Sequence, residues 1–294
     1  MRKIIVLTAF AALASSALAQ TKPTIGLSLS TLNNPFFVQL RDGAQKAAAA
    51  GKASLVVLDA QDRADKQASD IEDLITRKVN VIIVNPTDSD AIIPSIQMAN
   101  DAGIPVITVD RSANGGKVAY HVASDNVAGG KMAGEYIKKL LGGKGNVVEL
   151  QGLPGSSAAR DRGAGFGLVL KSTPALKRVS AQPADFNRAK GLSVMENILQ
   201  AQPSIAAVFA HNDEMALGAV QAVAAAKRKV LIVGFDATPD ALAAVKAGTM
   251  AATVAQQPGE IGRLGVVRAL DLIKTRKVPA KTVNVPVTLK LVTK

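Results

Sequence analysis

Polar and aromatic side chains follow directly after several short apolar runs of this sequence. The first run is followed by residues 31–37 (TLNNPFF). Later runs end in polar residues too, namely Asp59, Asn85, Asp110 with Arg111, the triplet His211, Asn212 and Asp213, and Asp236. Asp accepts hydrogen bonds from hydroxyl groups, Arg donates two in a fork, Asn does both, and aromatic rings cover apolar C–H faces. These residue types are typical of a pocket that binds a small sugar.

Each candidate also has a structural alternative, and position alone leaves both open. Asn34 precedes Pro35, so it fits a helix cap as well as a ligand contact. Phe36 and Phe37 are typical of a core, but an adjacent pair at a helix start cannot easily bury both rings on one face. The remaining candidates fit an ion pair, a turn or a cap equally well: Asp110, Arg111 and Asp236.

Short β-branched runs alternate with alanine-rich helical stretches along the chain. The runs predict strands at residues 24–30, 55–58, 81–84, 106–109, 146–150, 206–210, 230–235 and 251–254. The stretches predict helices at residues 38–50, 66–78, 91–102, 128–141, 158–171, 190–201, 214–226, 239–247 and 261–274. Runs without a polar residue, such as residues 81–84 (VIIV), are typical of strands buried on both faces. The alternation predicts an α/β fold with parallel sheets flanked by helices.

The number of strand–helix units exceeds what one compact sheet needs. About four units precede Ser124 and about four follow it, which predicts two similar doubly wound domains joined by a hinge. We assign residues 22–124 and 257–285 to an N-terminal lobe, and residues 125–256 and 286–294 to a C-terminal lobe. In open parallel sheets ligands bind outside the carboxyl ends of the strands, where the polar candidates lie.

The first residues have the pattern of a secretory signal peptide. Arg2 and Lys3 precede an almost uninterrupted apolar run at residues 4–14, and residues 17–19 (ALA) form a small-x-small cleavage site. The apolar run is short for a membrane span. We therefore expect cleavage after Ala19 and export of a soluble protein of about 275 residues to the periplasm.

Composition excludes several classes of protein. The chain has no cysteine, which excludes disulfides, iron–sulfur clusters and cysteine-ligated zinc. Its net charge of +12 suits an anionic partner, but the cations are scattered, Trp is absent and only two Tyr occur. A solvated basic surface is favoured over a nucleic-acid site.

Five segments, in order along the chain, resemble the ribose-binding type of the periplasmic sugar-binding proteins that serve ABC importers. They are residues 31–37 (TLNNPFF), 85–91 (NPTDSDA), 104–111 (IPVITVDR), 123–126 (ASDN) and 233–236 (VGFD). The resemblance extends from about Thr24 to the C-terminus. It implies two lobes that close on a sugar and then present a surface to a membrane permease, a surface that in the family can also meet a chemoreceptor.

The resemblance also implies a set of ligand-binding residues. Carried over position by position, they are Asn34, Phe36, Phe37, Asp110, Arg111, Arg162, Phe186, Asn212, Asp236 and Gln256. Residues 159–163 (ARDRG) contain two arginines, and the second one matches the ligand arginine of the family. We therefore choose Arg162 rather than Arg160. The expectation that ligand contacts follow the carboxyl ends of parallel strands, which we call the strand-end rule, also nominates Asp59 and Asn85. In the family these two positions are not direct ligands.

Three alternatives to a ribose carrier follow from the sequence. The same fold can bind allose, galactose or an autoinducer-like sugar. An enzyme is disfavoured, since the only two histidines are His121, in an expected strand, and His211, and since residues 142–145 (GGKG) lack the spacing of a phosphate-binding loop. A sugar-responsive transcription regulator would carry a helix-turn-helix where the signal peptide lies. We expect no catalytic residue, no cofactor, no metal and no nucleic acid, and a monomer.

Overall fold

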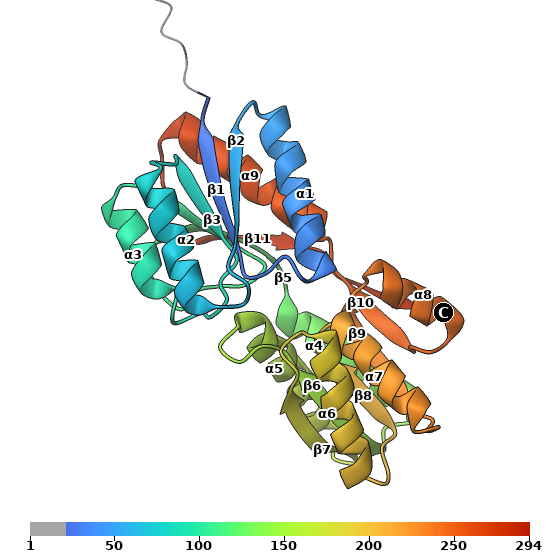
Figure 1. Ribbon diagram of the computed structural model, residues 1–294. Coiled ribbons are helices and arrows are strands. Elements are labelled where there is room, and N and C mark those ends of the chain that lie inside the picture. Colours follow the sequence, from blue (N-terminus) through green and yellow to red (C-terminus); the bar gives the residue numbers. More distant parts are fainter. Residues whose placement is uncertain (1–21) are drawn as a thin grey trace, which may run out of the picture.

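The computed structural model describes residues 22–294, so the predicted signal peptide lies outside the described residues. Within this range the strands form two separate six-stranded sheets, each covered by helices on both faces (Figure 1). The α/β class with two similar, mostly parallel sheets is therefore confirmed.

The first sheet has the strand order β11-β5-β4-β3-β1-β2, and all neighbouring strands in it are parallel. Its strands are β1 (Thr24–Leu29), β2 (Ser54–Asp59), β3 (Val81–Val84), β4 (Val106–Val109), β5 (Val118–Ser124) and β11 (Val283–Val287). Its helices are α1 (Pro35–Ala50) and α9 (Pro258–Thr275) on one face, and α2 (Ala64–Thr76) and α3 (Ile93–Asp101) on the other. We call this sheet with its four helices lobe 1.

The second sheet has the order β12-β10-β9-β8-β6-β7, and only its edge strand β12 is antiparallel. Its strands are β6 (Gly145–Gln151), β7 (Leu176–Pro183), β8 (Ala207–Ala210), β9 (Leu231–Asp236), β10 (Ala252–Ala255) and β12 (Lys290–Thr293). Its helices are α4 (Asn126–Leu140) and α5 (Ser157–Ser172) on one face, and α6 (Arg188–Ala201), α7 (Asp213–Ala225) and α8 (Pro239–Ala247) on the other. We call this sheet with its five helices lobe 2.

Burial explains why the central strands lack polar alternation. β3 (VIIV) and β4 (VITV) are buried at every residue, because helices cover both faces of the parallel sheet.

Glycines allow close helix packing beside the site. A Cβ on Gly130 of α4 would lie 2.0 Å from the carbonyl oxygen of Arg162, so this glycine lets α4 approach the α5 backbone that carries the arginine.

The predicted strands are confirmed to within one residue at each end, whereas some helices begin up to three residues earlier than predicted. β5 was expected around His121, but its bounds were not predicted. Three edge strands, β7, β11 and β12, were not predicted at all. Their residues are mostly exposed or half-buried, so they lack the continuous apolar run of a central strand. β11 continues to Val287, past residue 285 where the predicted N-terminal lobe ends; the lobe boundaries stay a prediction.

The lobes touch where the carboxyl ends of their strands face each other. The Ser89 amide donates to the Gly155 carbonyl oxygen (3.0 Å), and the Ser112 amide donates to Ser157 Oγ (2.8 Å). Each of these hydrogen bonds joins lobe 1 to the segment that opens α5 in lobe 2. The structure is therefore one in which the lobes have come together.

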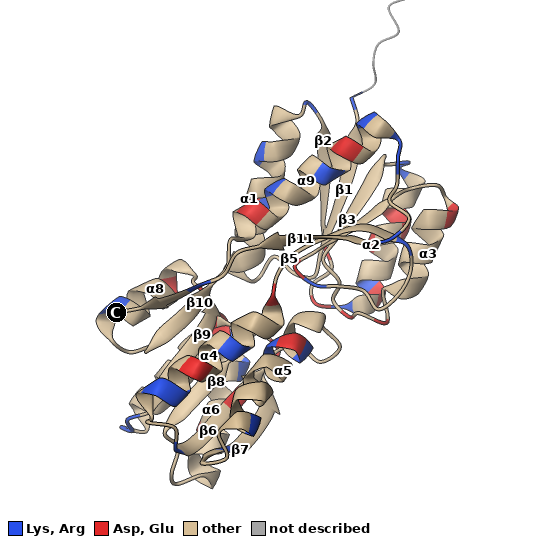
Figure 2. Ribbon diagram, turned by 180° about the vertical axis from the view of Figure 1, so that it is seen from behind, with Lys and Arg blue, Asp and Glu red and all other residues tan. Residues whose placement is uncertain are grey.

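Charged residues are spread over the helices of both lobes, with Lys and Arg interspersed with Asp and Glu (Figure 2). This agrees with the scattered basic residues of the sequence. Among the residues that the structure describes, no helix is long and apolar enough to cross a membrane.

Candidate functional site

A narrow cavity between the lobes gathers most of the predicted ligand residues. Its lining residues are Asn34, Phe36, Phe37, Asp110, Arg111, Ala158, Arg162, Phe186, Asn212 and Asp236. Nine of these were predicted, and Ala158 was not. The tenth predicted residue, Gln256, lies behind the cavity and donates from Nε2 to Asp236 Oδ1 (2.9 Å).

The loop after β1 supplies one polar and two aromatic groups. Asn34 Oδ1 accepts a hydrogen bond from the Phe36 amide (2.9 Å), so Asn34 caps α1 and also lines the cavity. Phe36 and Phe37 are both buried and meet edge to face, with ring centroids 5.2 Å apart. Both rings belong to the core of lobe 1 and also line the cavity, and their edge-to-face arrangement lets two adjacent residues at a helix start do both.

The end of β4 supplies a carboxylate and a guanidinium. Asp110 has a positive φ of 60°, a backbone conformation that Asp tolerates better than most residues. Asn85, at the end of β3, donates from Nδ2 to Asp110 Oδ2 (3.2 Å) and to the Val109 carbonyl oxygen (3.0 Å). Asn85 does not line the cavity and acts by orienting Asp110. The strand-end rule thus found a residue that holds a predicted ligand in place.

Arg162 is the matching guanidinium of lobe 2. Its Nε donates to Asn126 Oδ1 (2.8 Å), and one terminal nitrogen donates to the His211 carbonyl oxygen (2.6 Å). The guanidinium carbon lies 3.8 Å from the centroid of the Phe235 ring, a cation–π contact. Three neighbours therefore fix the orientation of Arg162 beside the cavity.

Asp236 at the end of β9 is the carboxylate of lobe 2. Its Oδ1 lies 3.8 Å from a terminal nitrogen of Arg162. Burial raises the pKa of Asp236 well above its ordinary value; the Arg162 charge opposes this shift and the nearby Asp213 adds to it. A carboxyl group so far from water needs hydrogen-bonding partners inside the cavity.

Aromatic rings from both lobes flank the arginines. The Arg111 guanidinium carbon lies 5.2 Å from the centroid of Phe37 in lobe 1 and 5.1 Å from that of Phe186 in lobe 2. Asn212, the cap of α7, donates from Nδ2 to the Phe186 carbonyl oxygen (3.2 Å). The contact of Arg111 with Phe186 exists only while the lobes are together.

Three buried polar atoms of this region have no hydrogen-bond partner among residues 22–294. They are Asp110 Oδ1, Arg111 Nε and Gln256 Oε1. Burying such atoms unpaired is costly. Two acceptors and one donor from both lobes therefore suit a small polyhydroxylated molecule, since a hydroxyl group both donates and accepts.

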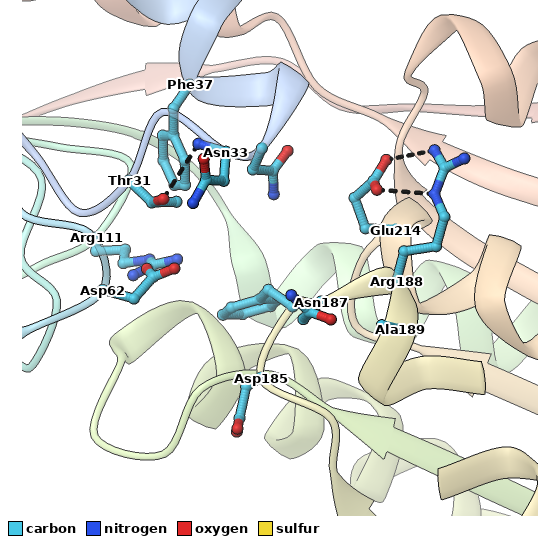
Figure 3. A pocket seen from close by; sticks show the side chains of 12 residues that line it. Thr31, Asn33, Phe37, Asp62, Arg111, Asp185, Asn187, Arg188, Ala189 and Glu214 are labelled. Carbon is cyan, nitrogen blue, oxygen red and sulfur yellow. Dashed lines mark hydrogen bonds and ion pairs between the residues drawn. The ribbon is translucent and has the colours of Figure 1, made fainter. Parts of the chain in front are cut away.

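A wider pocket borders the cavity and shares Asn34, Phe37, Arg111 and Phe186 with it. Figure 3 shows Asp62 beside Arg111 on its lobe 1 side, and Arg188 paired with Glu214 on its lobe 2 side. Burial raises the pKa of Asp62 in spite of the nearby Arg111 charge.

A buried pair lies behind Arg162. His211 Nδ1 accepts from the Gly152 amide (3.3 Å), so the neutral ring carries its proton on Nε2 and donates to Glu149 Oε1 (2.9 Å). Burial holds the pKa of His211 below its ordinary value, and the Glu149 carboxylate only partly opposes this. Although burial acts against it, hydrogen bonds from His211 and Arg178 hold the pKa of Glu149 below its ordinary value.

These directions predict that acid destabilises the protein partly through His211. Below pH ~6.5 the unfolded histidine takes up a proton that the folded one does not, so the free energy of unfolding decreases as pH falls, by at most about 1.4 kcal/mol per pH unit for one proton. Urea unfolding from pH 7.5 to 5.5 should show a smaller decrease for His211→Gln than for the wild type. Equal slopes would contradict a neutral buried His211.

The sequence missed residues that support the ligands. Asn126 follows the end of β5, a strand that was not delimited, so the strand-end rule passed over it. Asp59 was nominated by that rule, but its Oδ1 accepts from the Gln61 amide (2.9 Å) at an exposed position away from the cavity. Among residues 22–294 no group of three or more His, Cys, Asp or Glu is placed to hold a metal ion.

Comparison with known proteins gives a consistent family assignment. The family model described as periplasmic binding protein domain matches residues 25–277. The ribose import binding protein of Escherichia coli is 51% identical over 297 residues, which cover 100% of this chain and 99% of the relative. The D-allose-binding periplasmic protein of the same species is 35% identical and covers 85% of this chain and 84% of the relative.

A solved structure agrees with these relatives. The Caulobacter myo-inositol binding protein, bound to myo-inositol, superposes with a TM-score of 0.87 at 38% identity, covering 92% of this chain and 93% of that one. Each of these similar proteins is named as a binding protein. The fold, the cavity between two lobes and the full-length similarity together place this chain in the periplasmic binding protein domain family.

Proposed function

We propose that the protein captures D-ribose between its lobes and delivers it to an ABC importer in the membrane. The observation that carries the proposal is a set of buried polar atoms without partners among the described residues: Asp110 Oδ1 and Arg111 Nε in the aromatic-lined cavity, and Gln256 Oε1 directly behind it. The similarity to ribose import binding proteins at about half identity over the full chain supports ribose in particular.

The proposed binding residues divide between the lobes. Lobe 1 contributes Asn34, Phe36, Phe37, Asp110 and Arg111, and lobe 2 contributes Arg162, Phe186, Asn212, Asp236 and, at the crossover, Gln256. Phe37 comes from lobe 1 and Phe186 from lobe 2, and both rings line the cavity, where they can pack against the apolar faces of a sugar ring. The carboxylates and arginines offer acceptors and donors to its hydroxyl groups.

Closure follows from this division of contacts. The sugar makes all its contacts only when the lobes are together, so binding shifts the population from open to closed. We place the hinge at the three crossings between lobes, which follow β5, β10 and β11, close to the predicted boundaries 124/125, 256/257 and 285/286. Only the closed form then presents one continuous surface to the permease. We propose a chemoreceptor as a second binding partner of that surface.

The site also argues against chemistry on the sugar. His211 is buried, neutral and hydrogen-bonded to Glu149, so it is not aimed at the cavity. We therefore propose a carrier that has no catalytic residues, cofactor or metal. It is exported to the periplasm after cleavage following Ala19 and acts as a monomer.

Thermal unfolding with a panel of sugars tests the choice of ligand. A ligand present at a thousand times its Kd stabilises the folded state by about 4 kcal/mol. Ribose at a fixed millimolar concentration should raise the Tm of the mature protein by several degrees, and allose, xylose, glucose and galactose should raise it less. A larger rise with allose or galactose would replace ribose by that sugar, and no rise with any of them would contradict the sugar-carrier proposal.

A further inference from the structure

The turn that carries Asp236 has an unusual backbone. Asp236 has a φ of 118° and Ala237 a φ of 58°, so two consecutive residues that are not glycine have positive φ. Such conformations are strained for residues other than glycine and persist only where the surrounding structure fixes them. The turn therefore needs specific restraints.

Two buried side chains supply these restraints. Thr253 of β10 accepts the Ala237 amide at Oγ1 (3.2 Å) and donates its own hydroxyl to Asp213 Oδ1 (2.7 Å). Asp213 Oδ2 in turn accepts the Thr238 amide (2.7 Å). The amides of two consecutive turn residues are thus tied, through one hydroxyl and one carboxyl group, to strand β10 and the start of α7.

The surroundings fit these two side chains closely. Asp213 and Thr253 are both fully buried, and among the described residues neither lines the cavity. Gly234 of β9 leaves room for the carboxyl group, since a Cβ there would lie 2.3 Å from Asp213 Oδ1. Their contribution to a ligand is therefore made through the position of Asp236.

We infer that Asp213 and Thr253 are positioning residues that hold the strained Asp236–Ala237 turn, and with it the Asp236 carboxyl group, in its binding orientation. The inference rests on the proposed role of Asp236 in sugar binding. Lobe 1 has a matching arrangement, in which Asn85 at the end of β3 holds Asp110, also a residue with positive φ, at the end of neighbouring β4.

Thr253→Val gives the sharpest test, because valine keeps the shape and removes the hydroxyl group. The Ala237 amide and Asp213 Oδ1 then lose their shared partner in a buried place. We expect the Kd for ribose to rise on the order of tenfold, while Thr253→Ser, which keeps the hydroxyl, stays within about threefold of the wild type. Asp213→Asn, which replaces one acceptor by a donor, should also raise the Kd on the order of tenfold.

Thr249→Val is the matched control. Thr249 lies close in sequence, but its hydroxyl group donates to the Ala244 carbonyl oxygen (3.2 Å) at an exposed position. This variant should bind ribose like the wild type. Titrations are made well below the Tm of each variant, so that a change in Kd is not a change in the fraction folded.

Hydrogen exchange separates this inference from the proposed function, since it needs no sugar. In Thr253→Val the amides of Ala237 and Thr238 should exchange at least tenfold faster than in the wild type, while core amides of β8 stay protected. Unchanged exchange at these two amides, or a Kd unchanged in a variant that is only less stable, would overturn the positioning role. If the wild type itself bound no sugar, the proposed function would be contradicted. The exchange rates of the two amides would still show whether Thr253 holds the turn.

Discussion

Replacing Arg162 by alanine is expected to weaken ribose binding by about a hundred- to a thousandfold. Arg162 is buried, stacks on Phe235 and lies 3.8 Å from the Asp236 carboxylate. Truncating one partner of a buried charge pair costs about 2–5 kcal/mol, because the other charge is left without compensation. Calorimetric titration of Arg162→Ala with ribose measures the effect, and circular dichroism checks that the variant is folded.

Arg160→Ala is the control for this variant. Arg160 lies half a turn away on the same helix, is about half exposed and forms its ion pair with the neighbouring Asp161 (3.2 Å). Its removal should leave the Kd within about twofold of the wild type. Equal losses in both variants would mean that α5 as a whole is disturbed, and a normal Kd for folded Arg162→Ala would remove this arginine from the site.

Asp110→Asn is expected to weaken ribose binding by about a hundredfold. Asparagine has nearly the same shape and tolerates the positive φ of this position, so the backbone can stay in place. The change removes the charge that lies 3.8 Å from Arg111 and turns one carboxylate oxygen into a donor. The loss of this neighbouring charge for buried Arg111, together with one lost acceptor for a sugar hydroxyl, costs about 2–3 kcal/mol.

Asp59→Asn provides a matched comparison in the same sheet. Asp59 also ends a parallel strand, but it caps the Gln61 amide at an exposed position and does not line the cavity. We expect its Kd to stay within about twofold of the wild type. If Asp59→Asn weakened binding as much as Asp110→Asn, the carboxylate requirement would not be specific to the cavity.

Much of the fold could be predicted because central parallel strands leave a strong sequence signal. Residues 81–84 (VIIV) are apolar throughout, and the structure buries all of them as β3. The edge strands left no such signal. β7 has mostly exposed or half-buried residues, and β11 contains Pro286, which a strand accepts at an edge.

The site could be predicted only where the sequence position of a single residue, or its match to the family, identified that residue. Strand ends gave Asn34, Asp110 and Asp236 from position, and the family resemblance added Arg162 and other residues that lie within helices or loops. Apart from Asn85 and Asp213, which follow strand ends, neither route showed the residues that orient them. The bond from Asn126 to Arg162 spans 36 positions of the chain, so its existence depends on how α4 and α5 pack.

Calorimetric titration of the purified mature protein with D-ribose tests the central claim most directly. We predict one site per chain with a Kd of about 1 µM or tighter. This corresponds to a binding free energy of about 8 kcal/mol or more in favour of the complex. The physical reason is that the buried donors and acceptors of the cavity become paired when the sugar binds. At the micromolar ribose concentrations that saturate the wild type, Arg162→Ala should give no binding heat, because its Kd is expected to be about a hundred- to a thousandfold higher. Absence of a binding heat in the folded wild-type protein up to millimolar ribose would contradict the claim that the cavity between the lobes captures this sugar.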